Sequence, residues 1–266
     1  MRKRGAYSKS WKKARKTGAR AERLAASVLK SGCSDPALLS RLGVTSPLTR
    51  VKVVGGKLVQ SAVAAGMVPP KADVTAETGA RRLGVSVKAN KESRLALHTV
   101  DNVCAAMATL YEYAPGAAAR TSLDLLAGGP QVEAFYRKNA RFHPTARRST
   151  MGGFDQRLYQ AAELTALLQW LHLGMPFFAE FLFGRGLGEG GEASHVWYFS
   201  PADELDKICE VSAIVAACRD APAPVVTSGG SGMGIKLPFG SLETAGGRLV
   251  FRHSYNALCA LGVPFR

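Results

Sequence analysis

The sequence predicts a mixed α/β (α+β) fold, and three observations support this class. Apolar residues recur at helical spacing near the N-terminus and again between 154 and 184. Short β-rich runs, such as GVSVKAN and HVWYFS, stand between the helical segments. The chain has 266 residues, 47% of them hydrophobic and 21% charged, so it can bury a substantial core.

The first element is a basic N-terminal segment. Residues 2–20 carry nine lysine or arginine side chains and no acidic one. Because like charges at this density repel one another, we expect residues 1–20 to be an arm ahead of a single domain over 21–266. A solubilising tail is the alternative interpretation of the same residues.

A helix is predicted from about Ser10 to Leu29. Its apolar residues fall three and four positions apart, at Ala21, Leu24, Ala25, Val28 and Leu29. Glu22 is the first acid of the chain and should border this apolar face. The segment that follows, to about residue 68, fits either a helix or a strand, and Pro69-Pro70 would end a helix.

A β-hairpin is predicted next, with a turn at Gly79 and a valine-rich second strand that ends at Lys88. Side chains alternate between the two faces of a strand. If Glu77 faces Arg82 across the turn, Asp73 comes to lie opposite Ser86, and Lys88 is its diagonal neighbour. A slip of one residue in register would separate Asp73 from Lys88.

The rest of the chain is expected to alternate between helices and strands. The apolar stretch 164–183 contains polar side chains, which argue against a membrane span. It is predicted to be a core helix that is broken near Gly174–Pro176. HVWYFS, ending at Ser200, reads as a strand, and the end of the chain is rich in β-like runs and turns. Helices are expected at about 97–113, 131–139, 154–184 and from Ser200 to about Cys218.

Charge and cysteine content narrow the function. Thirty-five basic and 20 acidic side chains give a formal net charge of +15, which would attract DNA, RNA or an anionic membrane. The five cysteines are scattered without a CxxC pair, which argues against a zinc site or a disulfide framework and favours free thiols in a reducing cytoplasm.

The predicted hairpin brings an aspartate beside a lysine, which suits metal-assisted cleavage of a phosphodiester. The carboxylate of Asp73 can bind a hard cation such as Mg²⁺. Lys88 can orient or deprotonate the attacking water and offset charge on the phosphate. An ordinary ion pair at the protein surface is the competing interpretation of the same two residues.

KADV followed by GVSVKAN, with a helix glutamate before them, resembles the PD-(D/E)xK nuclease motif, and particularly type II restriction endonucleases. The resemblance covers about residues 20–95. It implies a central mixed sheet flanked by helices, a catalytic core over about 21–115, and DNA-binding elaboration over about 116–266. It also implies that Asp73, Glu22 and the backbone carbonyl of Val87 bind the metal, while Lys88 acts on the water.

Ser86 departs from the motif, because it stands where the family usually has a second acid. The position resembles the SxK variant of the motif, in which serine is a supporting ligand. The predicted catalytic set is therefore Asp73, Ser86, Lys88 and Glu22, with Glu77 a poorer substitute for the missing acid.

The expected function is that of a Mg²⁺-dependent restriction-type endonuclease, with Mn²⁺ as a possible substitute, acting on double-stranded DNA and not on a membrane. A homodimer is implied by the resemblance. The alternatives are a non-catalytic nucleic-acid-binding or assembly protein, and a phage or repair nuclease of the same fold. Predicted DNA contacts are Lys12, Lys13, Lys16, Asn90, Lys91, Arg94, Arg141, Arg147 and Arg148.

Overall fold

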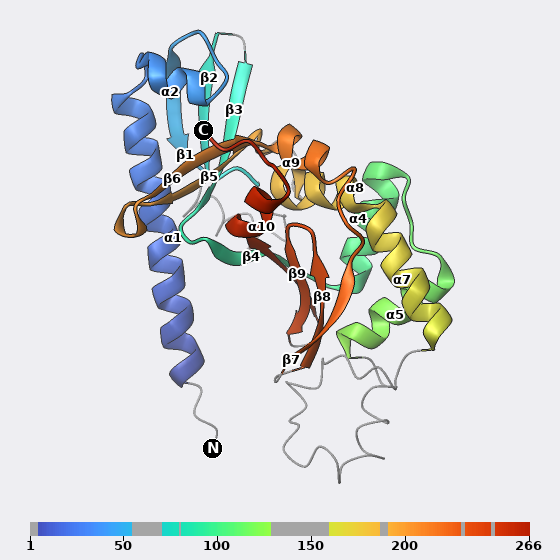
Figure 1. Ribbon diagram of the computed structural model, residues 1–266. Coiled ribbons are helices and arrows are strands. Elements are labelled where there is room, and N and C mark those ends of the chain that lie inside the picture. Colours follow the sequence, from blue (N-terminus) through green and yellow to red (C-terminus); the bar gives the residue numbers. More distant parts are fainter. Residues whose placement is uncertain are drawn as a thin grey trace. The chain divides into compact units, whose positions relative to one another are not determined.

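The computed structural model describes residues 5–54, 71–79, 81–128, 160–186, 191–229, 232–245 and 248–266. These residues form two five-stranded sheets and the helices labelled in Figure 1, which confirms the mixed α/β class. The chain divides into two compact units, where the sequence led us to expect one domain. The first unit comprises Met1–Lys91, Phe183–Ile214 and Val263–Arg266, and the second comprises Glu92–Leu182 and Val215–Gly262.

The first unit contains a mixed sheet with the strand order β1-β2-β3-β5-β6. Neighbouring strands are antiparallel except β3 and β5, which are parallel. The strands are β1 (Leu48–Val53), β2 (Val74–Thr78), β3 (Arg81–Lys88), β5 (His195–Ser200) and β6 (Leu205–Glu210). The strand predicted from HVWYFS is thus confirmed as β5, whereas β1 was not foreseen.

Helix α1 (Gly5–Ser31) packs against β1, β2, β3 and β5. Its buried residues are mostly alanines, Ala21, Ala25 and Ala26 with Leu29. Leu24 and Val28, which were expected on the buried face, are more than one-third exposed. The helix runs without a break past residue 20, so the predicted end of the arm does not coincide with the end of an element.

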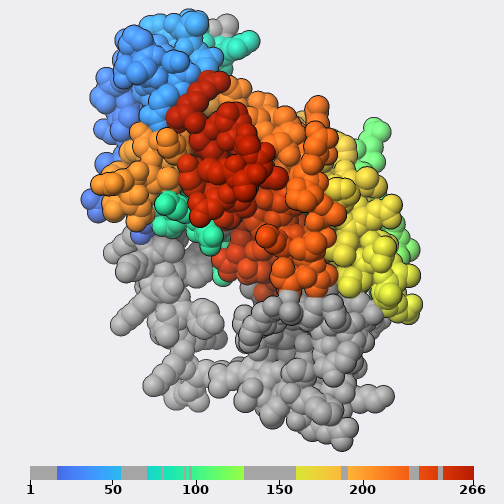
Figure 2. Space-filling view, in the orientation of Figure 1, coloured from blue at the N-terminus to red at the C-terminus, as the bar shows by residue number. Residues whose placement is uncertain are grey.

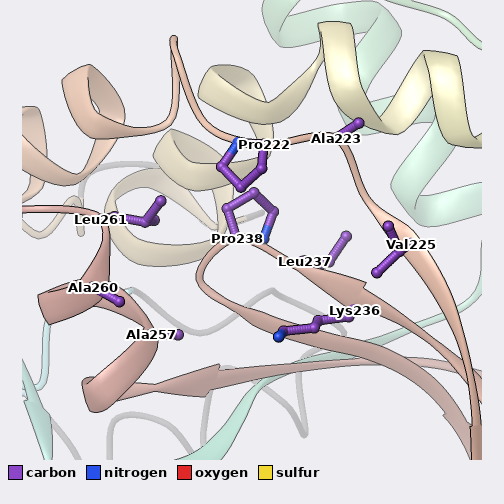
Figure 3. Close-up of a pocket in the computed structure, with 9 residues that line it drawn as sticks. All are labelled: Pro222, Ala223, Val225, Lys236, Leu237, Pro238, Ala257, Ala260 and Leu261. Carbon is purple, nitrogen blue, oxygen red and sulfur yellow. The ribbon is translucent and has the colours of Figure 1, made fainter.

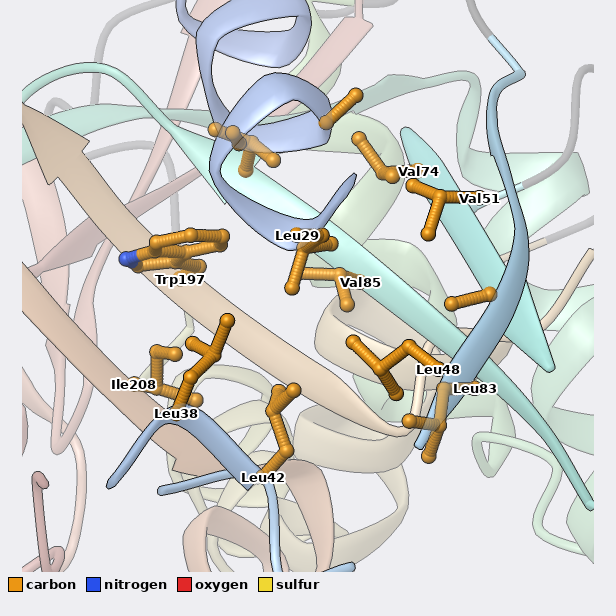
Figure 4. Packing of buried hydrophobic residues seen from close by; sticks show 14 of the residues in the cluster. Leu29, Leu38, Leu42, Leu48, Val51, Val74, Leu83, Val85, Trp197 and Ile208 are labelled. Atoms are coloured by element: carbon orange, nitrogen blue, oxygen red, sulfur yellow. The ribbon is translucent and has the colours of Figure 1, made fainter. Parts of the chain in front are cut away.

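The core of the first unit lies between α1 and the sheet (Figure 4). Leu29 points toward Val85 of β3, and Trp197 of β5 closes one side. The short helix α2 (Pro36–Arg41) adds Leu38 to the same cluster. Trp197 satisfies its buried indole N–H by donating to Asp206 Oδ1 at 2.7 Å. This packing holds β2 and β3 against α1.

The hairpin of β2 and β3 has the predicted register. Glu77 pairs with Arg82 and Val74 pairs with Val85, and Gly79 makes the turn with a φ of 56°. Continuing this register places Asp73 opposite Ser86, as the sequence analysis anticipated. Val85 faces the α1 core, so alternation directs Ser86 to the other face of the sheet.

Gly84 allows β3 to approach the segment that leads into β5. A β-carbon at this position would lie 1.9 Å from the backbone oxygen of Glu192. We expect Gly84→Ala to destabilise the protein by about 3 kcal/mol or more, because backbone atoms must move apart. Urea unfolding would measure this loss, with Gly116→Ala as the control, since nothing lies within 4 Å of the corresponding β-carbon. Equal stability of the two variants would contradict the close approach.

The second unit contains an antiparallel sheet with the order β4-β10-β9-β8-β7. Figure 2 shows the segment from β7 to α10 as one continuous orange and red surface. The strands are β4 (Glu92–His98), β7 (Val225–Gly229), β8 (Gly232–Leu237), β9 (Gly240–Ala245) and β10 (Arg248–Ser254). The helices are α4 (Val100–Tyr111), α5 (Ala117–Ala127), α7 (Ala161–Leu173), α8 (Met175–Ala179) and α10 (Tyr255–Ala260). The β-rich end of the chain is confirmed.

Two predicted helices are wrong in extent. The helix expected from about residue 97 begins only at Val100, because the preceding residues pair with β10 and Thr99 caps the helix. The helix expected from Ser200 is a single 3-10 turn (Pro201–Asp203), since Glu204 adopts a φ of 51° and returns the chain into β6. Helix α9 (Val211–Ala217) follows that strand. The helix predicted at 131–139 lies outside the described residues.

The apolar stretch at 164–183 is broken, as predicted. Helix α7 ends at Leu173, and after Gly174 the chain continues as α8 and a π-helical turn (Glu180–Arg185), bent by 66°. Among the described residues no single helix is long and apolar enough to cross a membrane. The bent pair meets that criterion only when its two halves are counted together.

Candidate active site

Asp73 lies immediately before β2, and its backbone is held from both sides. Its N–H donates to the carbonyl of Val85 at 2.9 Å, and its carbonyl accepts from the N–H of Val54 at 2.9 Å. Because the neighbouring strands supply both bonds, the position of this residue follows from the sheet and not from its own side chain.

The carboxylate of Asp73 is fixed through one of its oxygens. Oδ2 accepts a hydrogen bond from the backbone N–H of Val87 at 2.7 Å and another from the hydroxyl of Ser86 at 3.2 Å. The other oxygen, Oδ1, makes no hydrogen bond within the described part of the chain. The carboxylate is therefore oriented and keeps one oxygen for a ligand.

Ser86 connects Asp73 with Lys88. Its hydroxyl donates to Asp73 and accepts from Lys88 Nζ at 2.6 Å, and the residue is buried. Ser86, which stands where the motif usually has an acid, is therefore engaged in hydrogen bonds on both sides and is not free to bind a ligand. It holds the ammonium group of Lys88 beside the aspartate, and both of these roles occupy its single oxygen.

The acid and base groups of the site perturb one another. The pKa of Glu22 is raised to about 6, mainly by burial and also by the negative charge of Asp73, while Lys88 and Arg23 oppose the rise. Burial lowers the pKa of Lys88, against the influence of Asp73 and Glu22. The charges of Glu22, Asp73 and Lys88 therefore act on one another.

Lys71 is a second lysine of this neighbourhood, and the sequence analysis missed it. The pKa of its amine is lowered to about 7, mainly by burial and also by the charge of Lys88, while Asp73 opposes both. One signal could have identified it: Lys71 stands only two residues before Asp73 in the sequence.

The donors present suit a hard divalent cation such as Mg²⁺. They comprise the free oxygen of Asp73, the carboxylate of Glu22 and the carbonyl of Val87, which faces the Asp73 side because its own N–H does. Mg²⁺ typically uses one or two carboxylates and keeps several waters. No group of three His, Cys, Asp or Glu side chains that could hold a metal occurs among the described residues, so an all-protein cage is not available there.

The remaining predicted site residues fall into three groups. Asn90 and Lys91 are exposed in the turn after β3, and Arg94 is exposed on β4 in the second unit. Glu77 is engaged by Arg50 at 3.3 Å, so it does not replace the missing acid. Lys12, Lys13 and Lys16 lie on α1 with side chains outside the described set, and Arg141, Arg147 and Arg148 lie outside the described residues.

A separate cavity of about 380 Å³ lies within the second unit (Figure 3). Its lining is apolar apart from Lys236, and it contains no acid or histidine. The lining residues are Pro222, Ala223, Val225, Lys236, Leu237, Pro238, Ala257, Ala260 and Leu261. Since this lining offers no pair of groups for proton transfer, the cavity is not a candidate for hydrolysis.

Comparison with known proteins identifies no family. No family model matches the chain, and no curated protein matches its sequence. Among solved structures, the chain is similar to a crystal structure of the restriction endonuclease MspI in complex with its cognate DNA. The match has a TM-score of 0.40 and 12% identity, over 81% of this chain and 75% of that chain. A TM-score of 0.40 does not establish a shared fold.

Proposed function

We propose that this protein is a metal-dependent DNA endonuclease of restriction type, which hydrolyses phosphodiester bonds in duplex DNA. The observation that carries the proposal is the hydrogen-bonded series from Asp73 through Ser86 to Lys88. It orients a carboxylate with one free oxygen beside a buried lysine, and Glu22 contributes a second carboxylate. This is the set of groups that metal-assisted hydrolysis of a phosphodiester requires.

Asp73, Glu22 and the carbonyl of Val87 would hold Mg²⁺, or Mn²⁺ in its place. When bound, the cation would offset negative charge on the phosphate and lower the pKa of a coordinated water. Val87 N–H and the Ser86 hydroxyl keep the Asp73 carboxylate in one orientation. Burial makes the ammonium form of Lys88 less favourable, so its amine is suited to accept the proton of the attacking water.

The excess of basic side chains supports a polyanionic substrate. A net charge of +15 raises the local concentration of nucleic acid around the protein. Asn90 and Lys91 are exposed and follow Lys88 directly in the chain, so they are suited to contact phosphates next to the scissile one. Dimerisation, which would allow both strands to be cut, remains part of the proposal.

The direct test is cleavage of long, unmethylated genomic DNA, which presents many recognition sequences at once. We expect the wild-type protein to produce discrete fragments with Mg²⁺ or Mn²⁺ and none with EDTA. Asp73→Asn should reduce the cleavage rate by about 10³-fold, because the amide keeps the side-chain shape and loses the charge that binds the cation. Circular dichroism would show that the variant is folded. Undiminished cutting by Asp73→Asn would exclude this site.

A second candidate function is nucleic-acid binding without catalysis. It is favoured by Ser86, which leaves the site with only two carboxylates, Glu22 and Asp73. This candidate predicts that the wild-type protein shifts duplex DNA in a binding assay and cuts none of the genomic DNA with any divalent cation. The cleavage assay above therefore separates the two functions.

A further inference from the structure

Lys71 is placed by its backbone and by a glycine beside it. The N–H of its neighbour Ala72 donates to the carbonyl of Gly191 at 2.7 Å, which fixes the chain just before Asp73. A β-carbon at Gly186 would lie 3.5 Å from both Cβ and Cδ of Lys71. The aliphatic part of the lysine therefore runs along this glycine, and the whole arrangement lies within the first unit.

The charge of Lys71 has no partner of its own among the described residues. No carboxylate of that set forms an ion pair with it, and no hydrogen bond from its amine is present there. Asp73 is the acid that influences it, yet the bonded oxygen of Asp73 is already occupied by Val87 and Ser86. A half-buried lysine without a partner is costly unless an anion completes its surroundings.

Two features of the site point to the nature of that anion. Lys71 stands two residues before Asp73, which is linked to Lys88 through the hydroxyl of Ser86, so two lysine amines belong to one small region. The free oxygen of Asp73 lies in the same region. A phosphodiester carries its single negative charge on two non-bridging oxygens, so it can contact both a lysine and an Asp73-bound cation.

We propose that Lys71 binds a non-bridging oxygen of the scissile phosphate, as a second cationic group of the active site beside Lys88. This inference rests on the proposed nuclease function. Lys71 would hold the phosphate, whereas Lys88, anchored by Ser86, would act on the water. The two lysines thereby have different tasks, since within the described part of the chain Lys88 alone is held by a protein acceptor.

The first test measures phosphate contact without catalysis. Binding of a fluorescent DNA duplex in EDTA is followed at several salt concentrations for wild type and for Lys71→Met, which keeps the length of the side chain. Each phosphate contact contributes about 0.9 to the slope of log affinity against log salt. We expect Lys71→Met to lower that slope by about this amount. Exposed Lys30 on α1 provides the matched control, and the proposal requires the slope to fall more for Lys71→Met than for Lys30→Met.

The second test measures cleavage with Mg²⁺. We expect Lys71→Met to lower kcat about 100-fold with a smaller change in KM, because the contact strengthens as negative charge develops on the phosphate. Lys71→Arg should restore part of the rate, since it restores the positive charge. A thermal melt confirms that each variant is folded, and a variant that unfolds is replaced by Lys71→Gln.

The two proposals fail in different ways. If wild type cleaves DNA and Lys71→Met matches it in both slope and kcat, Lys71 does not contact the phosphate. A lowered slope with unchanged kcat would also overturn the role at the scissile phosphate. If wild type cleaves nothing, the nuclease function fails, and the salt slope alone then decides whether Lys71 contacts a phosphate.

Discussion

Lys88→Met is expected to reduce the rate of DNA cleavage by about 10³-fold and to make the metal-free protein more stable. The loss of rate follows because methionine can neither take up a proton nor offset charge on the phosphate. The gain in stability follows because burial makes the ammonium group of Lys88 costly, in spite of Asp73 and Glu22. If Lys88 only filled space in the core, its substitution would lower both the cleavage rate and the stability.

The sign of the stability effect depends on pH. The pKa of Lys88 is lowered in the folded protein, so between the folded and the ordinary value the unfolded chain binds the extra proton. Stability therefore rises with pH in this range, and the penalty is fully present below the folded pKa. Lys88→Met lacks this penalty, so its advantage over wild type should shrink toward pH 10.

Thermal unfolding in EDTA at pH 7 and near pH 10 measures the difference in stability between Lys88→Met and wild type. The cleavage rate is measured with Mg²⁺ on the same protein preparations. We expect an advantage of about 1 kcal/mol at pH 7, or a few degrees in Tm. Ser86→Ala is the informative companion, because it removes the acceptor that anchors Lys88 and leaves the amine in place. A Lys88→Met protein that cuts DNA at the wild-type rate would refute the assignment.

Glu22→Gln is expected to weaken activation by Mg²⁺ by about 100-fold or more, because it removes one of the two carboxylates proposed to hold the cation. Raising the Mg²⁺ concentration should recover part of the rate, as the remaining ligands still bind. The measurement is the Mg²⁺ concentration at half-maximal cleavage. Exposed Glu192, which pairs with Arg185, provides a control as Glu192→Gln.

The same substitution has a second consequence in the absence of metal. The pKa of Glu22 is raised to about 6, mainly by burial, so its ionised form is disfavoured in the folded protein. The contribution of Glu22 to the stability of the folded protein is therefore greatest below the ordinary pKa of a glutamate. This contribution is lost as the pH rises through about 6. In EDTA, Glu22→Gln should match wild type near pH 4.5 and exceed it at pH 8, by less than about 1 kcal/mol because the side chain is partly exposed. An unchanged difference across this range would show that the pKa of Glu22 is not raised in the folded protein.

The hairpin could be predicted because its signals are local. Alternating apolar residues, a glycine turn and a pairing that starts from Glu77 and Arg82 determine which side chains meet across two neighbouring strands. Asp73, Ser86 and Lys88 are all within that range, so their order on one face followed from the pattern. Glu22 required a longer inference, from the resemblance of a helix glutamate ahead of the hairpin to the nuclease motif.

Two elements were misassigned because tertiary pairing overrode the local signal. The residues Leu205–Glu210 follow a helix-like start, yet they pair with β5 and become the edge strand β6. Similarly, β4 forms because β10, more than 150 residues later, supplies its hydrogen-bond partners. Contacts of this separation leave little trace in a single sequence.

Local signals in the chain were enough to predict the hairpin, the alternation of its two faces, and an aspartate beside a lysine at its open end. How these groups interact with one another depends on contacts that form in the folded protein. Ser86 became the link between Asp73 and Lys88, because the register brings its hydroxyl between them. Burial and the charge of Lys88 lower the pKa of Lys71, an effect that depends on the folded arrangement of these groups.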